Sequence, residues 1–269
     1  MTGPGARFTA IRDSIGPLCV GIDPSTDLLA RWGLPDSAAG ALEMGLAVVA
    51  SSVSRVGIVK PQVAFFERFG SAGFTALETV ISAAREENLV VIADAKRGDI
   101  GTTMQAYASA WLASGPLQSD AVTVSPYQGF ESLEPAFGMA DASGATVFVL
   151  CATSNADAAA VQGATVGEQS LPSAIAAFAR NRNRGGTCVG LVVGATRPLL
   201  ESGLTVADVE GTLLLAPGFG AQGAQLSDLS TLFGAASSTV IPSVSRSVLA
   251  AGPTGIGDAI NNHRRELGL

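Results

Sequence analysis

The sequence predicts an α/β fold, a single-domain (β/α)₈ barrel of the TIM type over residues 1–269, from the number, spacing and composition of its apolar runs. Eight short runs rich in β-branched residues recur along the chain, and Ala-rich stretches of helical character separate them. Eight βα units in about 250 residues is the usual size of this barrel. With 47% hydrophobic residues, the chain can also bury a large core. A doubly wound open sheet is the alternative architecture.

Each apolar run predicts one strand. The runs are continuously apolar where an exposed sheet would alternate, which is typical of strands buried on both faces of a parallel sheet. In chain order the predicted strands cover residues 17–23, 55–62, 89–97, 121–126, 145–153, 188–194, 212–218 and 239–246. Between them, residues 38–53, 74–88 and 102–115 have the pattern of amphipathic crossover helices. Polar residues end most runs, so we expect the site at the face formed by the C-terminal ends of the strands.

Composition and charge exclude several classes of function. The net charge of -7 argues against nucleic acid as a partner, because phosphate backbones are bound by surplus Lys and Arg. No apolar run approaches the roughly 18 residues of a membrane helix, and we expect a cytoplasmic protein with no membrane partner. The cysteines Cys19, Cys151 and Cys188 are far apart and lack CxxC spacing, which predicts buried thiols. The single histidine, His263, is expected at a solvated helix end, so acid-base chemistry must use other groups.

Only two of the 16 basic residues are lysines, Lys60 and Lys96, and each follows the apolar part of a predicted strand. Because arginine serves elsewhere, a retained lysine indicates a need for a compact ammonium that can lose a proton. The alternative is that two solvated lysines survive by chance at strand ends.

The second lysine lies in the pattern Asp94-x-Lys96-x-x-Asp99. Residues two apart in a strand point the same way, so Asp94 and Lys96 can both face the barrel mouth and form a salt bridge. Asp99 lies in the following loop. There it could help Asp94 to hold the ammonium charged, or it could simply cap the next helix.

A glycine-rich loop follows the seventh predicted strand. Residues 218–223 read Gly-x-Gly-x-x-Gly, as in dinucleotide sites, but no acidic residue lies between Asp228 and Asp258 to bind a ribose. In a barrel, the loops after strands seven and eight commonly bind phosphate, and glycines let backbone N–H groups approach it closely. Arg246, which ends the eighth run, would supply a forked cation for that phosphate, and Gln222 an amide contact.

Together these residues resemble the orotidine 5'-phosphate decarboxylase family, in its longer, mycobacterial-like bacterial branch. The family's Asp-x-Lys-x-x-Asp signature corresponds to DAKRGDIGTT (94–103), its phosphate loop to APGFGAQG (216–223) and its terminal arginine to SVSRSV (243–248). The similarity covers essentially the whole chain in order. It implies decarboxylation of orotidine 5'-monophosphate to uridine 5'-monophosphate in pyrimidine synthesis, by a homodimer with shared active sites and with no metal or other cofactor.

The resemblance also implies a role for each matching residue. Three residues are expected to be catalytic: Lys96 as the proton donor to C6, Asp94 beside the scissile carboxylate, and Asp99 from the neighbouring subunit. The expected substrate-binding residues are Asp23 and Lys60 for the ribose, Thr103 from the neighbouring subunit, Ser154 for the pyrimidine, Pro217, Gln222 and Gly223 in the phosphate loop, and Arg246 for the phosphate. Thr153 takes the place of Ser154 if the alignment shifts by one residue.

Two alternatives stay open at this point. The related group of keto-gulonate phosphate decarboxylases and hexulose phosphate synthases shares the barrel and the Asp-x-Lys-x-x-Asp pattern but uses Mg²⁺. It would need further carboxylates at strand ends, whereas the second run ends in Lys60-Pro61-Gln62. The other alternative is a catalytically silent barrel that binds a nucleotide, in which the lysine and both aspartates would have no obvious binding role.

Overall fold

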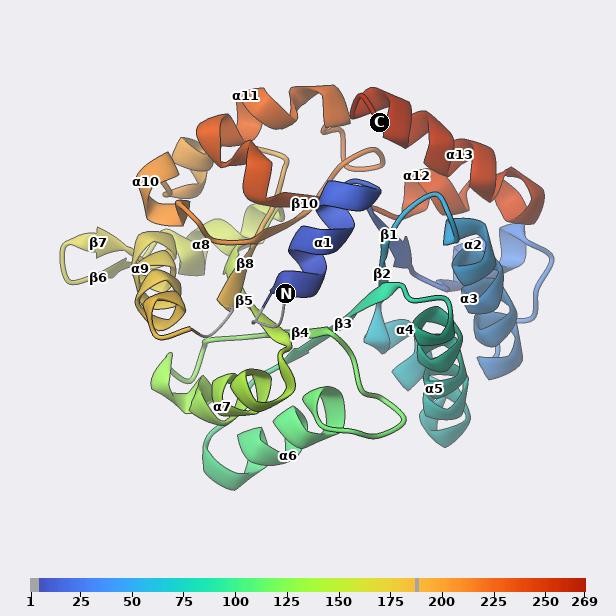
Figure 1. Ribbon diagram of the computed structural model, residues 1–269, viewed down its shortest axis with the longest axis horizontal. Coiled ribbons are helices and arrows are strands. Elements are labelled where there is room, and N and C mark those ends of the chain that lie inside the picture. The colour runs from blue at the N-terminus through green and yellow to red at the C-terminus, as the bar shows by residue number, and fades with distance from the viewer. Residues whose placement is uncertain (1–4, 187–188) are drawn as a thin grey trace.

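The computed structural model describes residues 5–186 and 189–269, so Cys188 and residues 1–4 of the predicted domain lie outside the described residues. Eight parallel strands close into a barrel in the order β1-β10-β9-β8-β5-β4-β3-β2, which confirms the predicted fold class (Figure 1). The barrel strands are β1 (Cys19–Ile22), β2 (Ile58–Pro61), β3 (Val90–Arg97), β4 (Ala121–Val124), β5 (Thr146–Ala152), β8 (Val189–Val193), β9 (Leu214–Pro217) and β10 (Val240–Val244). Each lies within one of the eight predicted runs.

Helices surround the barrel (Figure 1). The longer ones are α1 (Ala6–Ser14), α3 (Ala38–Ser52), α5 (Gly70–Glu86), α6 (Gly101–Leu112), α7 (Glu134–Ser143), α9 (Leu171–Arg184) and α13 (Gly252–Glu266). The shorter ones are α2 (Thr26–Arg31), α4 (Val63–Glu67), α8 (Ala159–Gln162), α10 (Val206–Val209), α11 (Leu229–Phe233) and α12 (Arg246–Leu249), with 3₁₀ turns η1 (Glu131–Leu133), η2 (Ala156–Ala158), η3 (Leu199–Ser202), η4 (Leu226–Asp228) and η5 (Gly234–Thr239). The three predicted helices correspond to α3, α5 and α6. In residues 5–186 and 189–269, no helix has the length and apolar character needed to cross a membrane.

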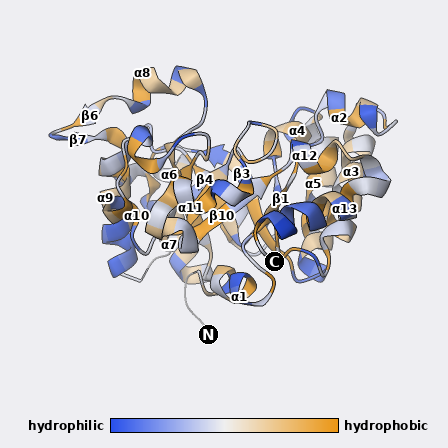
Figure 2. Cartoon of the chain, turned by 90° about the horizontal axis from the view of Figure 1, so that it is seen from above, coloured by the Kyte–Doolittle hydropathy of each residue, from blue (hydrophilic) through white to orange (hydrophobic). Residues whose placement is uncertain are grey.

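The connection between β5 and α9 carries an addition that the apolar pattern did not predict. It contains α8 and an antiparallel hairpin of β6 (Thr165–Val166) and β7 (Gln169–Ser170), which projects from the edge of the molecule (Figure 2). The hairpin ends where the Ser170 hydroxyl accepts a hydrogen bond from Ser173 N and caps α9. Such a cap contributes about 1 kcal/mol to helix stability.

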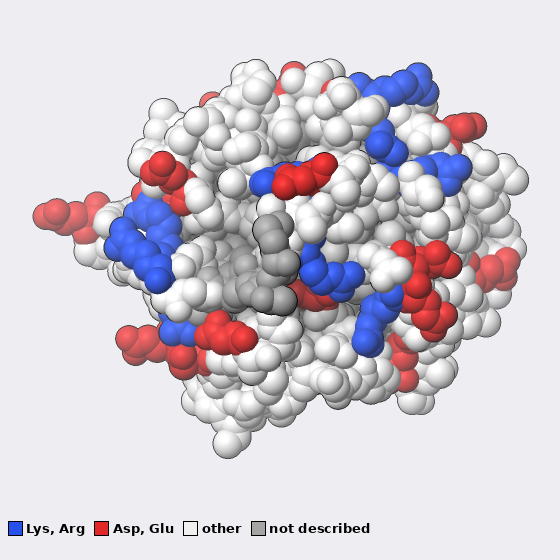
Figure 3. All heavy atoms as spheres, in the orientation of Figure 1, with Lys and Arg blue, Asp and Glu red and all other residues white. Residues whose placement is uncertain are grey.

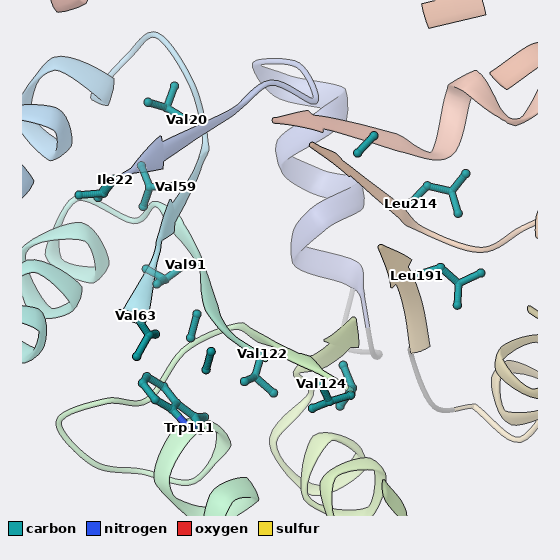
Figure 4. Close-up of a cluster of buried hydrophobic side chains, with 14 of the residues drawn as sticks. Val20, Ile22, Val59, Val63, Val91, Trp111, Val122, Val124, Leu191 and Leu214 are labelled. Carbon is teal, nitrogen blue, oxygen red and sulfur yellow. The ribbon is translucent and has the colours of Figure 1, made fainter. Parts of the chain in front are cut away.

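Alternate residues of the strands face two separate cores. The outward residues pack against the helices, as Figure 4 shows for Val20, Val91 and Leu214 and for Trp111 of α6. The inward residues fill the barrel itself, and the apolar ones among them are Cys19, Ile58, Val90, Ile92, Ala121, Phe148, Val192, Leu215 and Ile241. This inner layer is the packed interior expected of the fold, and it excludes a through-going pore.

The N-terminal end of the barrel is closed by an aromatic pair. Phe8 of α1 packs edge to face against Phe148 of β5, with ring centroids 5.7 Å apart. Gly190 makes room for the second ring, because a Cβ at Gly190 would lie 2.4 Å from a ring carbon of Phe148. On the face that α1 crosses, acidic and basic side chains lie next to one another rather than in one patch of a single sign (Figure 3).

Towards the opposite end the inward positions become polar. Continuing the alternation, Ile58 is followed by Lys60, Ile92 by Asp94 and Ile241 by Ser243, all of them buried. The charged side chains of Lys60 and Asp94 therefore lie against the buried apolar layer that includes Ile58, Ile92 and Ile241. This packed layer excludes water, so water cannot screen their charges on that side.

His263 is less solvated than expected. Only 12% of its side chain is exposed, because α13 packs beside α12. Its Nε2 lies 2.9 Å from Ser247 Oγ and its Nδ1 lies 3.2 Å from Glu266 Oε2. The histidine thus links the last helix to the start of α12, where Arg246 lies.

Candidate active site

Asp94 is the centre of the polar layer, and four neighbours donate hydrogen bonds to its carboxylate. Oδ1 accepts from Lys96 Nζ at 2.6 Å and from Thr123 Oγ1 at 2.9 Å. Oδ2 accepts from Lys60 Nζ at 2.9 Å and from Gln62 Nε2 at 3.0 Å. Since a carboxylate offers about four acceptor sites, Asp94 is saturated and fixed in orientation.

The charges of this cluster stabilise one another. Burial raises the pKa of Asp94, but the ammonium groups of Lys60 and Lys96 outweigh burial and hold that pKa well below its usual range. Burial lowers the pKa of Lys60, but Asp94 and Asp23 outweigh it, so the pKa of Lys60 lies above its ordinary value. Desolvation raises the pKa of Cys19, which lies below the cluster, to about 12. Asp94 and Lys60 are therefore both charged at neutral pH, and the thiol is not.

The predicted pair of Asp94 and Lys96 is present, but the strand between them is irregular. The register of β3 on β4 shifts between Ala93 and Arg97, and Lys96 has a left-handed backbone with φ of 48°. For a residue with a Cβ this conformation costs about 1–2 kcal/mol. The Lys96 side chain is 45% exposed, against 10% for Asp94, so the ammonium lies at the border between the cluster and the space above it.

That space is a cavity of about 500 Å³ at the C-terminal end of the barrel, within the size range of small-molecule sites. Eight of the expected site residues line it: Asp23, Lys60, Asp94, Lys96, Ser154, Pro217, Gln222 and Arg246. Thr153 lines it as well. Gly223, Asp99 and Thr103 are not among the residues that line the cavity within this chain.

Asp23 lines this cavity, and its two carboxylate oxygens differ in their partners. Its Oδ2 accepts a hydrogen bond from Ser245 Oγ at 2.5 Å, while Oδ1 is buried and has no hydrogen-bond partner among the described residues. The close approach of β1 to the segment that follows β10 requires glycine here, because a Cβ at Gly21 would lie 2.7 Å from Ser245 Cβ. A buried carboxylate oxygen without a donor is costly unless a ligand hydroxyl satisfies it.

The glycine-rich loop after β9 folds back on itself. Gly218 and Gly220 have φ of 122° and 73°, which residues with a Cβ rarely adopt. Gly220 N donates to Ala224 O at 2.8 Å, and Gly223 N donates to Gly220 O at 2.9 Å. Arg246 begins α12 at the edge of the same cavity, and within the described chain no carboxylate forms a salt bridge with it.

The structure distinguishes Ser154 from Thr153. Ser154 Oγ donates to Gln222 Oε1 at 2.8 Å, which joins the loop after β5 to the glycine-rich loop. The Thr153 hydroxyl is already engaged, since it donates to Asn155 Oδ1 at 2.7 Å and accepts from Gln162 Nε2 at 2.9 Å. Ser154 is therefore the better placed of the two to exchange its partner for a ligand.

Asp99 and Thr103 lie in the β3–α6 connection and the first turns of α6, outside this chain's own cavity. Thr103 is exposed, and Asp99 Oδ1 accepts a hydrogen bond from Ile100 N at 2.8 Å. The alternative in which Asp99 caps α6 is not what the structure has, because the N-cap position is Ile100 and no side chain caps it.

Gln62 and Thr123 belong to the cluster but were not among the expected site residues. Gln62 also accepts a hydrogen bond from Lys96 Nζ at 3.3 Å, and Thr123 is only 1% exposed. Both have a signal in the sequence, because each lies at an inward position of its strand run: Gln62 two residues after Lys60, and Thr123 as the one polar residue among apolar neighbours.

The donor set of the cavity does not resemble a metal centre. Across residues 5–186 and 189–269, no three His, Cys, Asp or Glu side chains gather closely enough to hold a metal ion. At the end of β2, where a carboxylate ligand would be needed, the Gln62 amide bridges Asp94 and Lys96 instead.

A closed eight-stranded barrel, with a lysine and aspartate cluster at its mouth beside a glycine-rich loop, defines the chain as a TIM-barrel enzyme. The model of the Orotidine 5'-phosphate decarboxylase / HUMPS family matches residues 16–255. The chain belongs to this family.

Its relatives include two actinobacterial proteins named orotidine 5'-phosphate decarboxylase. The one from Salinispora arenicola is 51% identical over 93% of this chain and 90% of its own length, and the one from Streptomyces coelicolor is 49% identical over the same shares. A crystal structure from Streptomyces avermitilis has a TM-score of 0.93 and 45% identity, covering 99% of this chain and 95% of that chain. The OMP decarboxylase of Leishmania donovani has a TM-score of 0.80 and 33% identity, covering 97% of both chains.

Proposed function

We propose that this chain converts orotidine 5'-monophosphate to uridine 5'-monophosphate and CO₂ in pyrimidine synthesis, without a metal or other cofactor. The observation that carries the proposal is the Lys96 ammonium, 2.6 Å from a buried carboxylate oxygen of Asp94 at the mouth of the barrel. Membership of the family and relatives at about half sequence identity support the same activity.

The lining of the cavity supports one orientation of the substrate. The glycine-rich loop and Arg246 offer N–H groups and a guanidinium to the phosphate. Asp23 and Lys60, which both line the cavity, offer a carboxylate and an ammonium to the ribose hydroxyls. The linked pair of Ser154 and Gln222 then faces the pyrimidine. This orientation brings the scissile carboxylate towards Asp94 and Lys96.

In the reaction the bond between C6 and the carboxylate carbon breaks, and its electron pair stays on C6. Neutral CO₂ leaves, and the Lys96 ammonium donates a proton to C6 to form the new C–H bond. The lysine then recovers a proton from solvent, which its exposed side chain can reach. No oxidant or reductant is required.

Two electrostatic effects lower the barrier. The ionised Asp94 repels the substrate carboxylate, and this repulsion disappears as CO₂ leaves. The ammonium of Lys96 stabilises the charge that develops on C6, and it is preorganised because hydrogen bonds fix it before substrate binds. Decarboxylation with little resonance relief needs a large effect, of about 20 kcal/mol for the slowest reactions.

We infer that the active enzyme is a homodimer in which Asp99 and Thr103 complete the site of the neighbouring subunit. The surface around Asp99 supports a protein contact, because Ile100 and Tyr127 are 62% and 85% exposed. These two apolar side chains lie on adjacent loops, which the hydrogen bond from Gln128 Nε2 to Gly98 O holds together. Apolar groups on a fixed surface are typical of protein interfaces.

We also propose that residues 1–269 form one catalytic domain with a cytoplasmic location. The closing contacts between β1 and β10 support a single unit. The buried free thiols of Cys19 and Cys151 suit a reducing compartment.

The test is to follow the ultraviolet spectrum of orotidine 5'-monophosphate with purified, chelator-treated protein, because loss of the carboxylate changes the chromophore. We expect turnover that EDTA does not reduce and that Lys96→Ala abolishes while the circular dichroism spectrum is kept. Activity that requires added Mg²⁺ would favour the sugar-phosphate group of the family. Binding of the nucleotide without turnover would favour a silent barrel.

The shared site has its own test. When inactive Asp94→Ala and Asp99→Ala chains are mixed, each hybrid dimer has one intact site, so about a quarter of wild-type turnover should return after random exchange. No recovery, with subunit exchange demonstrated by mass spectrometry, would show that each site uses one chain only.

A further inference from the structure

The backbone of Lys96 has an unusual conformation. Among the non-glycine residues that the structure describes, only Ser54, Asn88 and Lys96 have positive φ. The first two lie in turns that follow helices, where this conformation is ordinary, whereas Lys96 lies in barrel strand β3. A residue is held in such a conformation only when its surroundings determine it.

The local geometry of β3 explains why the lysine needs support. Ala93 pairs with Val122 and Arg97 pairs with Val124, so four steps along β3 correspond to two steps along β4. The extra residues form a bulge, and their N–H groups lose the regular carbonyl partners of the ladder. A buried N–H group without a partner is unfavourable.

Thr123 supplies the missing partner. Its Oγ1 accepts a hydrogen bond from Lys96 N at 2.9 Å and donates one to Asp94 Oδ1, also at 2.9 Å. The hydroxyl has one proton, so donation to Asp94 leaves its lone pairs for the Lys96 N–H. The buried Thr123 hydroxyl therefore contacts both the backbone of Lys96 and the Asp94 carboxylate that accepts a hydrogen bond from the Lys96 ammonium.

We propose that Thr123 is a positioning residue, whose hydroxyl holds Lys96 in its left-handed conformation and thereby sets where the ammonium meets the substrate. This inference rests on the proposed decarboxylase function. The hydroxyl acts through the lysine. It fixes the backbone from which the long, half-exposed Lys96 side chain extends, while Asp94 fixes the ammonium at its tip. Misplacement of a reacting group by about 1 Å can reduce a rate about 100-fold.

The test compares two substitutions at one position with a matched control. Thr123→Val keeps the shape but removes both hydrogen bonds, and Thr123→Ser keeps the hydroxyl. The control is Thr146→Val, since Thr146 is also 1% exposed in a barrel strand but its hydroxyl has no partner among the described residues. We expect Thr123→Val to lower kcat about 100-fold and to change the dissociation constant of uridine 5'-monophosphate less than threefold. Thr123→Ser and Thr146→Val should keep kcat within about threefold of wild type.

A purely structural role for Thr123 would give a different result. In that case Thr123→Val would have a lower melting temperature and a smaller fraction of folded protein, but the kcat of the folded fraction would equal that of wild type. Thr123→Ser would then give no specific recovery of kcat. A Thr123→Val enzyme with kcat within threefold of wild type would overturn the inference, as would equal losses in the valine and serine variants.

Crystal structures of the two variants separate this inference from the proposed function. In Thr123→Val we expect Lys96 to have negative φ or its Nζ to leave Asp94, and in Thr123→Ser we expect the wild-type arrangement. An unchanged Lys96 in Thr123→Val would overturn the inference whether or not the chain is a decarboxylase. Wild-type protein without turnover would instead overturn the proposed function.

Discussion

Lys60 and Lys96 bind opposite oxygens of one carboxylate: Lys60 Nζ lies 2.9 Å from Asp94 Oδ2 and Lys96 Nζ lies 2.6 Å from Asp94 Oδ1. The two ammonium groups differ in exposure, at 7% and 45% of the side chain, and this difference divides their roles. Both lysines line the cavity: Lys60 is largely buried beside Asp94, and the half-exposed Lys96 extends further into the space above it.

The first prediction concerns stability. Asp94→Asn should lower the free energy of unfolding by about 3–5 kcal/mol at pH 7, because it leaves the buried Lys60 ammonium without its anion. Urea unfolding followed by circular dichroism measures the change. Asp36→Asn is the matched control, since Asp36 pairs with Arg68 on the surface and should change stability far less. Similar losses in the two variants would contradict the view that burial makes the Asp94 pair important.

The second prediction concerns the pH dependence of stability. The folded pKa of Asp94 lies below the ordinary 3.8, so its ionised carboxylate stabilises the fold above that pH and loses this effect as the pH falls through the folded pKa. The pKa of Lys60 is raised above 10.5, so its contribution persists below that pH and disappears only as the pH rises through the folded value. The stability difference between wild type and Asp94→Asn should therefore be constant near neutrality and shrink in acid. A difference that grows in acid would be inconsistent with an ionised Asp94.

The third prediction concerns Gln62, which holds Asp94 and Lys96 together. Gln62→Met keeps the length of the side chain and removes both hydrogen bonds, so kcat should fall about tenfold. Steady-state kinetics should show little change in KM, because the phosphate and ribose contacts are elsewhere. Gln118→Met is the control, since Gln118 binds Arg85 at the surface. An unchanged kcat in the Gln62 variant would mean that the amide does not help to orient the lysine.

The fourth prediction concerns the phosphate. Arg246→Ala should raise KM for orotidine 5'-monophosphate about 100-fold, because a charge-assisted contact is lost. The nucleoside orotidine, which lacks phosphate, provides the control: wild type and variant should process it equally slowly. If the variant were also impaired towards the nucleoside, Arg246 would have a role beyond phosphate binding.

The fifth prediction concerns the thiols. A pKa of about 12 leaves only on the order of one part in ten thousand of Cys19 as thiolate at pH 8, and burial also raises the pKa of Cys151. Iodoacetamide should therefore leave both residues unmodified in native protein and alkylate both in urea, as peptide mass spectrometry would reveal. Rapid labelling of Cys19 in native protein would show that the apolar interior of the barrel becomes accessible to solvent.

The barrel could be predicted from sequence because its strands carry a strong local signal. Residues 147–152 are apolar throughout, since both faces of β5 are largely buried. The salt bridge between Asp94 and Lys96 was predicted from the alternation of side chains along a regular strand, and the structure contains it although β3 is irregular at Lys96. The projecting hairpin of β6 and β7 was not predicted, because two short exposed strands have no apolar pattern to detect.

The remaining features of the site depend on contacts between strands, which no single run encodes. The left-handed Lys96 results from a mismatch in length between β3 and β4, and Thr123 has its role only because β4 lies beside that bulge. The surroundings of His263 likewise depend on how α13 packs. Its position near the end of the sequence predicted a solvent-exposed side chain, whereas in the structure its ring contacts Ser247 and Glu266.

The hydrogen bond between Ser245 and Asp23 joins residues 222 positions apart, across the seam where the last barrel strand meets the first. A chain emerging from the ribosome thus has no working pocket until β10 and Ser245 have been made. Translation products that stop before β10 would lack both Ser245 and Arg246 of the site, so we expect them to be inactive.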